Sequence, residues 1–482
     1  MARPERIYQT EPIRYQVGGD TVTEPARRLP VASQVDVVVS GGGPAGLGAA
    51  VGAARQGAST MLIERNAFLG GTATGALMAI WNMPLERMTG FAHDMTSRLI
   101  ASGGAVAGGP ATPFDPEHFK SVALEFVQES GIQLLLYTSV VAPIMEGRRI
   151  RGVVVENKGG RQAILAKNVV DCTGDGDLAA AAGVPFVKGR ESDGKMRPMT
   201  VLMRLGGLDL PCMVEYARAH PEEFDLDPNF QMLDLERGMV RFAGFFAHVR
   251  EAHARGELDP GLHYLRFEGV QVDKGMAYLN TVRVYDVDGT DAFDLTRAEL
   301  EAHRQMQQLL VFVKRRIPGC EDCYVVQTSP SIGVRETRRI RGRHVLTEQD
   351  IAAGRTYSDT IARLWRFHTP GVEMHSPDPV EGSPEDPLHR QLQRPLRSFE
   401  VPYGCLLPAE TDGLLIGGRA ISQDHAADGW TRGMYACMVT GQAAGTAAGL
   451  GALRNSSASA VSVRELQQAL ALQRVDLGSV TL

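Results

Sequence analysis

The sequence lacks the charge pattern of a nucleic-acid or membrane-surface protein. Its 482 residues contain 50 lysines and arginines against 56 aspartates and glutamates, which gives a formal net charge of −6. Such a balance creates no basic field that would attract nucleic acid or anionic lipid. We therefore expect a small-molecule substrate as the partner, with no nucleic acid and no membrane.

Cysteine is scarce, and only Cys320 and Cys323 of the six cysteines lie close together. No second pair and no group of histidines completes a tetrahedral zinc set, and the four-cysteine run of an iron–sulfur cluster is missing. We therefore expect no metal. Whether the C-x-x-C pair is redox active or consists of two ordinary thiols stays open. The pattern is typical of a reducing compartment, so we expect a cytoplasmic protein.

Long hydrophobic runs are also missing. Residues 1–34 are polar and contain no apolar core of a signal peptide. The stretch 433–453 carries no charged residue, but it consists mainly of glycine, alanine and threonine and includes Gln442. We expect a helix buried in protein rather than a membrane span. The chain is too long for one ordinary core, which favours two or three domains.

The most informative stretch that is present covers residues 35–65. An apolar strand runs into Gly-Gly-Gly-Pro-Ala-Gly, a helix of small residues follows, and a second strand ends at Glu64. In such a unit, Gly41 permits the tight turn, Gly43 lets a pyrophosphate approach the backbone, and Gly46 lets helix and strand pack closely. Glu64 stands where a carboxylate accepts hydrogen bonds from ribose hydroxyls. The pattern predicts a dinucleotide site, and the alternative is a structural glycine turn.

The remaining chain alternates helical and strand-like patterns. Thr296 and Glu299 predict a capping box at the start of a helix. Proline and glycine crowd residues 369–395, which predicts a long loop. We expect helices at 116–130, 297–316 and 462–474, and strands at 61–63, 133–136, 149–156, 162–170, 270–284 and 413–418.

Together these patterns predict an α/β protein. A Rossmann-like nucleotide-binding domain is expected from residues 35–195 together with 396–482, after an N-terminal extension at 1–34. An α+β substrate or cap domain is expected as an insertion at 196–395.

Two further motifs make the assignment more specific. Residues 171–177 read DCTGDGD, and residues 417–422 read GGRAIS, followed by GQAAGTAA at 441–448. With the first glycine loop, they resemble the FAD-dependent oxidoreductase family of the glutathione-reductase-like flavoprotein superfamily. The resemblance covers residues 35–475 and implies one tightly bound FAD per chain. It says little about the substrate, because the family acts on diverse molecules.

The resemblance also implies a set of cofactor-binding residues. Val140 matches a position whose backbone contacts adenine, and Gly174 lets the chain turn beneath the pyrophosphate. Asp175 is expected to bind backbone amides or a cofactor hydroxyl, although an N-capping aspartate explains it equally well. The full set is Gly41, Gly43, Pro44, Ala45, Gly46, Glu64, Arg65, Gly70, Gly71, Thr72, Val140, Gly174, Asp175, Gly418, Arg419, Gly429 and Thr431.

Three residues are candidates for catalysis. His375 and His425 lie in or near segments that resemble the family's flavin loops, and a neutral histidine suits proton abstraction near pH 7. The alternative is a hydrogen-bonded loop histidine in each case. Arg432 precedes the uncharged helix, whose N-terminus the resemblance directs at the flavin. We expect this pair of features to stabilise the negative charge of reduced flavin.

Four residues are candidates for substrate binding. Arg335 and Arg338 can present guanidinium groups to a carboxylate or an oxyanion, or can form ion pairs at the domain interface. Trp81 and Asn82 follow the glycine hinge at 70–71 and are expected to wall the pocket above the flavin ring. For Trp81, a place in the hydrophobic core is the alternative.

The function we expect is hydride transfer between a small organic substrate and flavin N5. Oxidation of an alcohol, an amine or a C–C bond is favoured over reduction. One alternative is a flavin monooxygenase using NAD(P)H and oxygen, although residues 195–395 contain no convincing second dinucleotide fold. A non-catalytic flavin-binding redox protein and a flavin-free NAD dehydrogenase are further alternatives. The electron acceptor, a covalent flavin link and homo-oligomer formation stay open.

Overall fold

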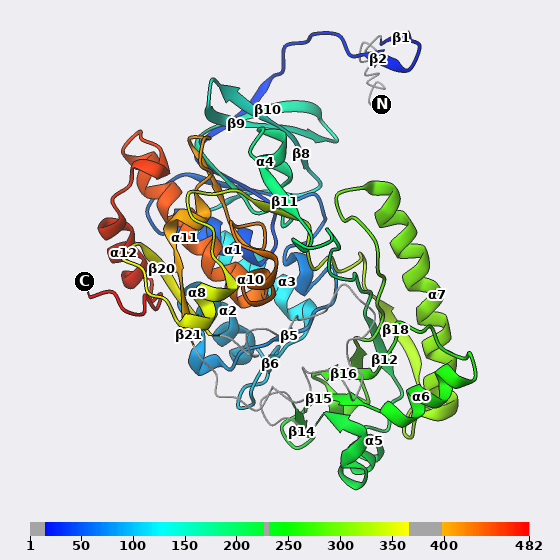
Figure 1. Ribbon diagram of the computed structural model, residues 1–482. Coiled ribbons are helices and arrows are strands. Elements are labelled where there is room, and N and C mark those ends of the chain that lie inside the picture. The colour runs from blue at the N-terminus through cyan, green and yellow to red at the C-terminus, as the bar shows by residue number, and fades with distance from the viewer. Residues whose placement is uncertain (1–14, 226–230, 366–397, 482) are drawn as a thin grey trace, which may run out of the picture.

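The computed structural model describes residues 15–225, 231–365 and 398–481. Its helices and strands form two bodies with separate hydrophobic cores (Figure 1). The larger core takes residues from both ends of the chain, and the smaller core takes residues 199–332. The α/β class and the inserted second body are therefore confirmed.

A parallel sheet forms the centre of the larger body. Its strands lie in the order β7-β4-β3-β10-β22, and each neighbouring pair in this order is parallel. This is the 3-2-1-4-5 order of a doubly wound nucleotide-binding sheet, whose ligands bind beyond the carboxyl ends of the strands. The strands are β3 (Val31–Ser40), β4 (Thr60–Ile63), β7 (Gln133–Leu135), β10 (Gly160–Asp171) and β22 (Leu414–Ile416).

The first half of β10 also belongs to an antiparallel meander. It pairs with β9 (Arg149–Asn157), which pairs in turn with β8 (Ser139–Glu146). A hairpin turn at residues 157–160 therefore joins the two strands expected at 149–156 and 162–170. Because the second half of β10 joins the parallel sheet, this one strand links the hairpin to the nucleotide-binding edge.

Helices from the two ends of the chain pack directly on each other. A β-carbon added to Gly445 of α11 (Met434–Leu453) would lie 1.8 Å from the carbonyl oxygen of Ala49 in α1 (Pro44–Ala54). At Gly48 it would lie 2.1 Å from the carbonyl oxygen of Met438. Only glycine permits this approach, so α11 is the buried helix that its composition predicts. Among the described residues, no helix combines the length and apolarity needed to cross a bilayer.

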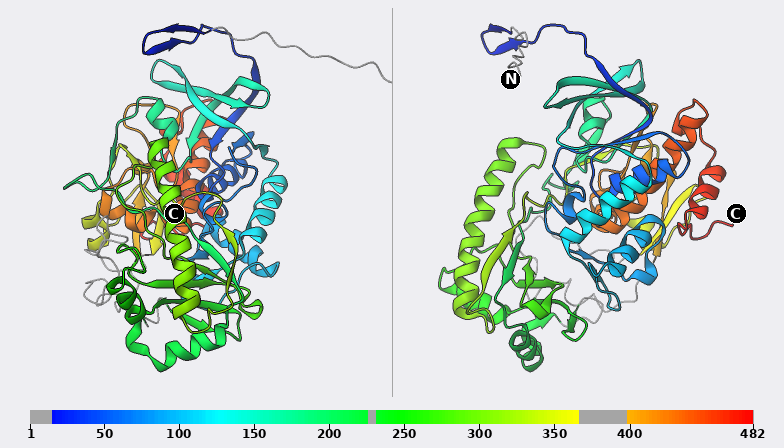
Figure 2. Two further views of the ribbon diagram at one scale, coloured as in Figure 1. Left: turned by 90° about the vertical axis from the view of Figure 1, so that its right-hand side faces the viewer. Right: turned by 180° about the vertical axis from the view of Figure 1, so that it is seen from behind.

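Further helices and short strand pairs complete the larger body. The β1–β2 hairpin stands away from the rest of the molecule (Figure 2). The helices are α2 (Gly90–Ala101), α3 (Pro116–Glu129), α4 (Asp177–Ala181), α8 (Glu348–Ala353), α10 (His425–Thr431) and α12 (Val463–Leu472). The strand pairs are β1 (Gln16–Gly18) with β2 (Thr21–Thr23), β5 (Ile80–Trp81) with β6 (Thr112–Pro113), β11 (Phe186–Lys188) with β19 (Arg338–Ile340), and β20 (Thr360–Trp365) with β21 (Ser398–Pro402).

The inserted body contains an antiparallel sheet. Its strands lie in the order β13-β15-β16-β17-β12-β18, with β14 paired to β15. One face carries apolar side chains such as Phe242 and Phe267, which pack in the smaller core with its three helices. The strands are β12 (Met203–Gly206), β13 (Phe224–Asp225), β14 (Met232–Asp234), β15 (Met239–Gly244), β16 (Leu265–Gly269), β17 (Ala277–Leu279) and β18 (Tyr324–Thr328), and the helices are α5 (Leu210–Ala219), α6 (Phe246–Ala254) and α7 (Ala292–Arg316).

Some predicted boundaries were wrong. Helix α7 begins at Ala292 because Asp291 caps it, accepting hydrogen bonds from the backbone N–H groups of Phe293 (2.7 Å) and Asp294 (3.1 Å). Thr296 lies inside the helix and donates to the carbonyl of Ala292 instead of capping. The expected strand at 270–284 is reduced to β17.

The inserted domain also ends differently from the expectation. Apolar side chains between 340 and 364 belong to the larger core, although the sequence assigned this stretch to the inserted domain. The predicted loop at 369–395 lies outside the described residues. The other domain boundaries stay a prediction.

Candidate functional site

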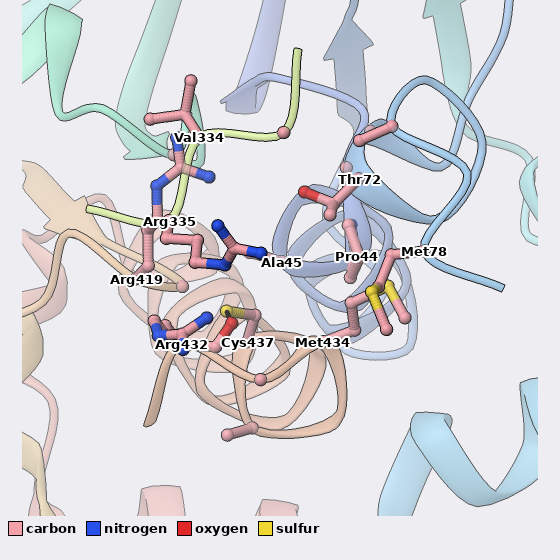
Figure 3. Close-up of a pocket in the computed structure, with 18 of the residues that line it drawn as sticks. Pro44, Ala45, Thr72, Met78, Val334, Arg335, Arg419, Arg432, Met434 and Cys437 are labelled. Carbon is pink, nitrogen blue, oxygen red and sulfur yellow. Dashed lines mark hydrogen bonds between the residues drawn. The ribbon is translucent and has the colours of Figure 1, made fainter. Parts of the chain in front are cut away.

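A cavity of about 430 Å³ opens at the carboxyl edge of the parallel sheet. Its lining comes from the glycine loop, from the start of α11 and from one face of the inserted sheet. Figure 3 shows Arg335, Arg419 and Arg432 gathered on one side of the cavity, with Met78 and Met434 on the other. Segments distant in sequence therefore share one concave site, and its volume is in the range of ligand pockets.

The glycine loop after β3 presents backbone to this cavity. Gly41 has φ +99°, and a β-carbon there would lie 2.5 Å from the carbonyl oxygen of Cys172. At Gly43 a β-carbon would meet protein no nearer than 3.7 Å, so its open side belongs to the cavity. Pro44 and Ala45, at the start of α1, line the cavity as well. Free N–H groups and the positive end of this helix suit a phosphate group.

Glu64 ties this loop to the second strand. Its carboxylate is buried and accepts hydrogen bonds from the Gly42 amide at 2.7 Å and from the Asn66 amide at 2.8 Å. Glu64 also lines the cavity. The side chain thus fixes the glycine loop and stands at the cavity wall. Its contact with ribose stays a prediction.

The second motif forms a turn at the wall of the cavity. Asp171 accepts hydrogen bonds from the amides of Thr173 (3.0 Å) and Ala179 (2.8 Å), and burial raises its pKa. Gly174 has φ +84° and lies against the guanidinium group of Arg419, and both line the cavity.

Asp175 is committed to protein contacts. Its carboxylate accepts hydrogen bonds from Arg419 at 2.5 Å and from Thr337 at 2.7 Å, and it does not line the cavity. This corrects the expected direct role of Asp175 in cofactor binding. The aspartate instead holds Arg419 at the cavity wall, across the two halves of the chain.

His425 lies in a buried polar cluster behind the cavity wall. Its Nδ1 atom is 2.8 Å from Oε1 of Glu336, and its backbone carbonyl accepts from Arg197 at 2.7 Å. Glu336 also pairs with Arg339 and accepts from the backbone N–H of Arg197 at 3.2 Å. His425 is absent from the cavity lining, so the structure places it away from the position expected of a proton acceptor.

The same cluster contains two carboxyl groups with opposite pKa shifts. Burial alone would raise the pKa of Glu336, but the hydrogen bond and charge of His425, with Arg197 and Arg339, lower it. Burial raises the pKa of Asp428, and the nearby charge of Glu336 adds to the rise. Asp428 lies 3.4 Å from Arg197 and 3.9 Å from Arg432, so the cluster reaches the cavity through Arg432.

Most other predicted site residues do line the cavity. Gly46 packs on the carbonyl of Gly41, Gly70 and Thr431 lie outside the lining, and His375 falls outside the described residues. The predicted residues found in the lining are Gly41, Gly43, Pro44, Ala45, Glu64, Arg65, Gly71, Thr72, Asn82, Val140, Gly174, Arg335, Gly418, Arg419, Gly429 and Arg432.

Two predicted substrate residues are placed elsewhere. Trp81 is fully buried in the larger core, with ring centroids 5.5 Å from Phe114 and 6.0 Å from Phe119. Arg338 forms an ion pair with Asp177 at 2.7 Å because β19 directs it toward the turn after β10. Both predictions of substrate contact are therefore wrong.

Several lining residues were missed by sequence reasoning. Arg241, Arg266 and Asn280 come from β15, β16 and the segment after β17. A signal was available, since both arginines interrupt apolar strand-like runs, MVRFAG and LRFEG. Tyr264, Trp365 and Thr200 also line the cavity.

The described lining contains no histidine. Its thiols are held protonated at neutral pH, since burial raises the pKa of Cys437 to about 12 and raises that of Cys172 well above its usual value. Arginines dominate the charged groups of the lining, which suits an anionic or electron-rich ligand.

Comparison with known proteins agrees with this geometry. A family model described as FAD dependent oxidoreductase matches residues 36–470. Thiamine thiazole synthase of Methanococcus vannielii is 29% identical over 156 residues, covering 29% of this chain and 56% of that protein. Dihydrolipoyl dehydrogenase of Trypanosoma brucei brucei is 31% identical over 169 residues, covering 33% of this chain and 34% of that protein. The chain thus spans about half of the first relative and a third of the second.

Among solved structures, the FAD-dependent chondrochloren halogenase of a myxobacterium is 12% identical to this chain. The match covers 91% of this chain and 78% of that one, with a TM-score of 0.49.

Proposed function

Because this chain belongs to the FAD dependent oxidoreductase family, whose model matches residues 36–470, we propose that it transfers a hydride between a small organic substrate and FAD. Oxidation of an alcohol, an amine or a C–C bond is the preferred direction. One observation carries the proposal: a single cavity joins the glycine loop to the polar face of the inserted sheet. A substrate resting on that sheet would share an enclosed space with the cofactor.

The residues present fit FAD. The backbone of Gly41 and Gly43 and the start of α1 would hold the pyrophosphate, and Glu64 would bind the ribose. When bound, FAD supplies a two-electron acceptor or donor. Arg432 and the first residues of α11 line the cavity as well, where the guanidinium group and the N-terminus of the helix would stabilise negative charge.

A proton acceptor is the remaining requirement for oxidation. His425 bonds to Glu336 behind the wall, so we assign it to positioning Glu336 and the loop that carries Arg432. His375 stays the proposed acceptor, although it lies outside the described residues.

A flavin monooxygenase is the second candidate. It shares with substrate oxidation the FAD dependence and the redox chemistry of the family to which the chain belongs. The described strands of the inserted sheet pair in antiparallel fashion, so a second Rossmann unit for NAD(P)H is missing from the described residues.

One experiment separates these candidates. The FAD-loaded protein is mixed anaerobically with a library of alcohols, amines and organic acids, and the flavin absorption band is followed. Substrate oxidation predicts that one class bleaches the band without NAD(P)H. If only NAD(P)H bleaches it, and oxygen then gives a hydroxylated product, the monooxygenase reading holds. If nothing bleaches it, the protein is a non-catalytic flavoprotein.

A further inference from the structure

The cavity-facing side of the inserted sheet carries a cluster of buried charged side chains. The register of strands β15 and β16 brings them together. Arg241 on β15 is paired across the ladder with Glu268 on β16, and Arg266 precedes Glu268 by two residues. Residues paired or separated in this way share one face of a sheet. The opposite face carries Phe242 and Phe267 in the smaller core.

Both arginines form ion pairs with the same carboxylate oxygen, and Arg266 lies closer to it than Arg241 does. Arg266 Nη2 lies 2.8 Å from Oε2 of Glu268, and Arg241 Nε lies 3.9 Å from it. The two guanidinium groups therefore stand side by side. Both line the cavity, whereas Glu268 is fully buried and does not. The carboxylate thus supports the arginines from behind and leaves them facing the ligand space.

Neutral polar groups surround this pair. Asn82 accepts a hydrogen bond from Arg241 at 2.7 Å, and Asn280 donates to Glu268 at 3.1 Å. The Oδ1 atom of Asn280 and the hydroxyl of Thr200 are buried in the lining without a hydrogen-bond partner in the structure. Buried polar atoms of this kind are normally satisfied. Asn280 Oδ1 needs a donor and the Thr200 hydroxyl can donate or accept, so a ligand that carries an O–H or N–H group beside its anionic group would satisfy both. Ala243, opposite Arg266, keeps the space in front of the arginines open.

We propose that Arg241 and Arg266 bind the carboxylate of a small organic acid and so define the substrate class of this oxidoreductase. The inference rests on the proposed function for its chemistry. Guanidinium groups match a planar carboxylate with paired donors, and they do so most strongly where water is excluded. Glu268 is a positioning residue, because it touches the arginines rather than the acid.

The test measures binding apart from turnover. FAD-loaded protein is titrated with monocarboxylates from formate to benzoate and with dicarboxylates from oxalate to glutarate, at constant ionic strength. Their primary amides and inorganic phosphate serve as comparison ligands. The readouts are the shift of the flavin absorption band and the thermal midpoint. We expect at least one acid to bind about 10- to 100-fold more tightly than its amide, as charge-assisted hydrogen bonds imply.

Substitutions of the two arginines then test whether they cause the tighter binding of the acid. Arg241→Met and Arg266→Met should each weaken acid binding about tenfold or more and leave amide binding unchanged. Arg241→Lys and Arg266→Lys keep the charge and should recover part of the affinity. Arg250→Met, an exposed position on α6, is the matched control and should bind like the parent protein. FAD content and circular dichroism verify that each variant is folded.

Several results would overturn the inference: acids and amides that bind equally, no acid that binds, phosphate that binds more tightly than every acid, or folded methionine variants with parental affinity. The comparison of acid with amide uses the parent protein alone, so it stays valid even if a variant misfolds. Anaerobic bleaching is measured separately. Acid binding with no bleaching by any hydroxy acid or amino acid would contradict the proposed function and would leave the carboxylate site supported. Bleaching only by neutral molecules would support the proposed function and contradict the carboxylate site.

Discussion

The imidazole of His425 and the carboxylate of Glu336 form a buried hydrogen bond of 2.8 Å behind the cavity wall. Glu336 comes from the segment that follows the core of the inserted domain, and His425 is the first residue of α10. The bond therefore ties two distant segments together next to Arg432. Its energetic consequences and its chemical consequences can be measured separately.

Replacement of Glu336 should destabilise the protein strongly. Glu336→Gln leaves Arg197 and Arg339 buried without their shared carboxylate, and loss of one partner from such a cluster costs about 3–5 kcal/mol. We expect a marked fall in the thermal midpoint at pH 7. Glu215→Gln, at an exposed position on α5, should leave the midpoint unchanged. Equal midpoints for the two variants would contradict the structural role of the cluster.

The same residue should give the protein part of its acid sensitivity. The pKa of Glu336 is lowered below its usual 4.5, so its stabilisation is present above that value and is lost as pH falls through the lower folded value. Thermal midpoints measured from pH 7 down to pH 3 should therefore fall less steeply below pH 4.5 in Glu336→Gln than in the parent. If the two curves of thermal midpoint against pH ran parallel, the Glu336 carboxylate would contribute nothing to the loss of stability at low pH.

Replacement of His425 should leave the acid–base chemistry intact. In His425→Asn the amide nitrogen can still donate to Glu336 from a position close to Nδ1. We expect flavin reduction by an active substrate to slow less than about tenfold, far below the 10²–10⁴-fold contribution of a general base. The pH profile of the rate should keep its shape. Loss of the fall in rate at low pH, where a proton acceptor becomes protonated, would return His425 to the role of proton acceptor.

Glu64 should control FAD retention. Glu64→Ala removes the acceptor of the Gly42 and Asn66 amides and the expected ribose contact. Hydrogen bonds to a charged group contribute about 1.5–3 kcal/mol, which corresponds to about 10- to 100-fold weaker FAD binding. Fluorescence of FAD released on dilution measures this change, with Glu215→Ala as the control. Unchanged retention would argue against Glu64 as a cofactor residue.

The packing of α1 on α11 should tolerate little change. A β-carbon at Gly445 would lie 1.8 Å from a backbone oxygen of α1, whereas one at Gly449, a turn later, would lie 3.1 Å away. We expect Gly445→Ala to destabilise the protein by about 1–3 kcal/mol or more. Gly449→Ala should change stability by less than about 1 kcal/mol, because alanine is the better helix former. Denaturant midpoints of the two variants give the comparison, and equal losses would contradict the close helix contact.

Much of the nucleotide-binding edge was readable from the sequence. The turn at Gly41, the open backbone at Gly43 and the acid at Glu64 obey local rules of strand, turn and helix, so their positions follow from spacing alone. The buried nature of α11 also followed from its composition. Residues that are neighbours in the sequence are sufficient to specify these features.

Other features depend on contacts between distant segments. Arg241 and Arg266 face the cavity because of strand register, which a single strand sequence does not reveal. Trp81 follows the glycine hinge, but its side chain lies in the larger core, where it packs against Phe114 and Phe119. His425 lies in a motif that resembles the family's flavin loop, but it forms a hydrogen bond with Glu336. No local sequence pattern predicts that partner. At α7, Asp291 caps the helix in place of the expected Thr296.

The account depends most directly on FAD lying in the cavity between the glycine loop and the inserted sheet. The visible absorption spectrum of the purified protein, followed by release and identification of the bound flavin, tests this claim. We expect flavin bands and about one FAD per chain, either as purified or after FAD is supplied. A colourless protein that takes up no FAD would contradict the claim.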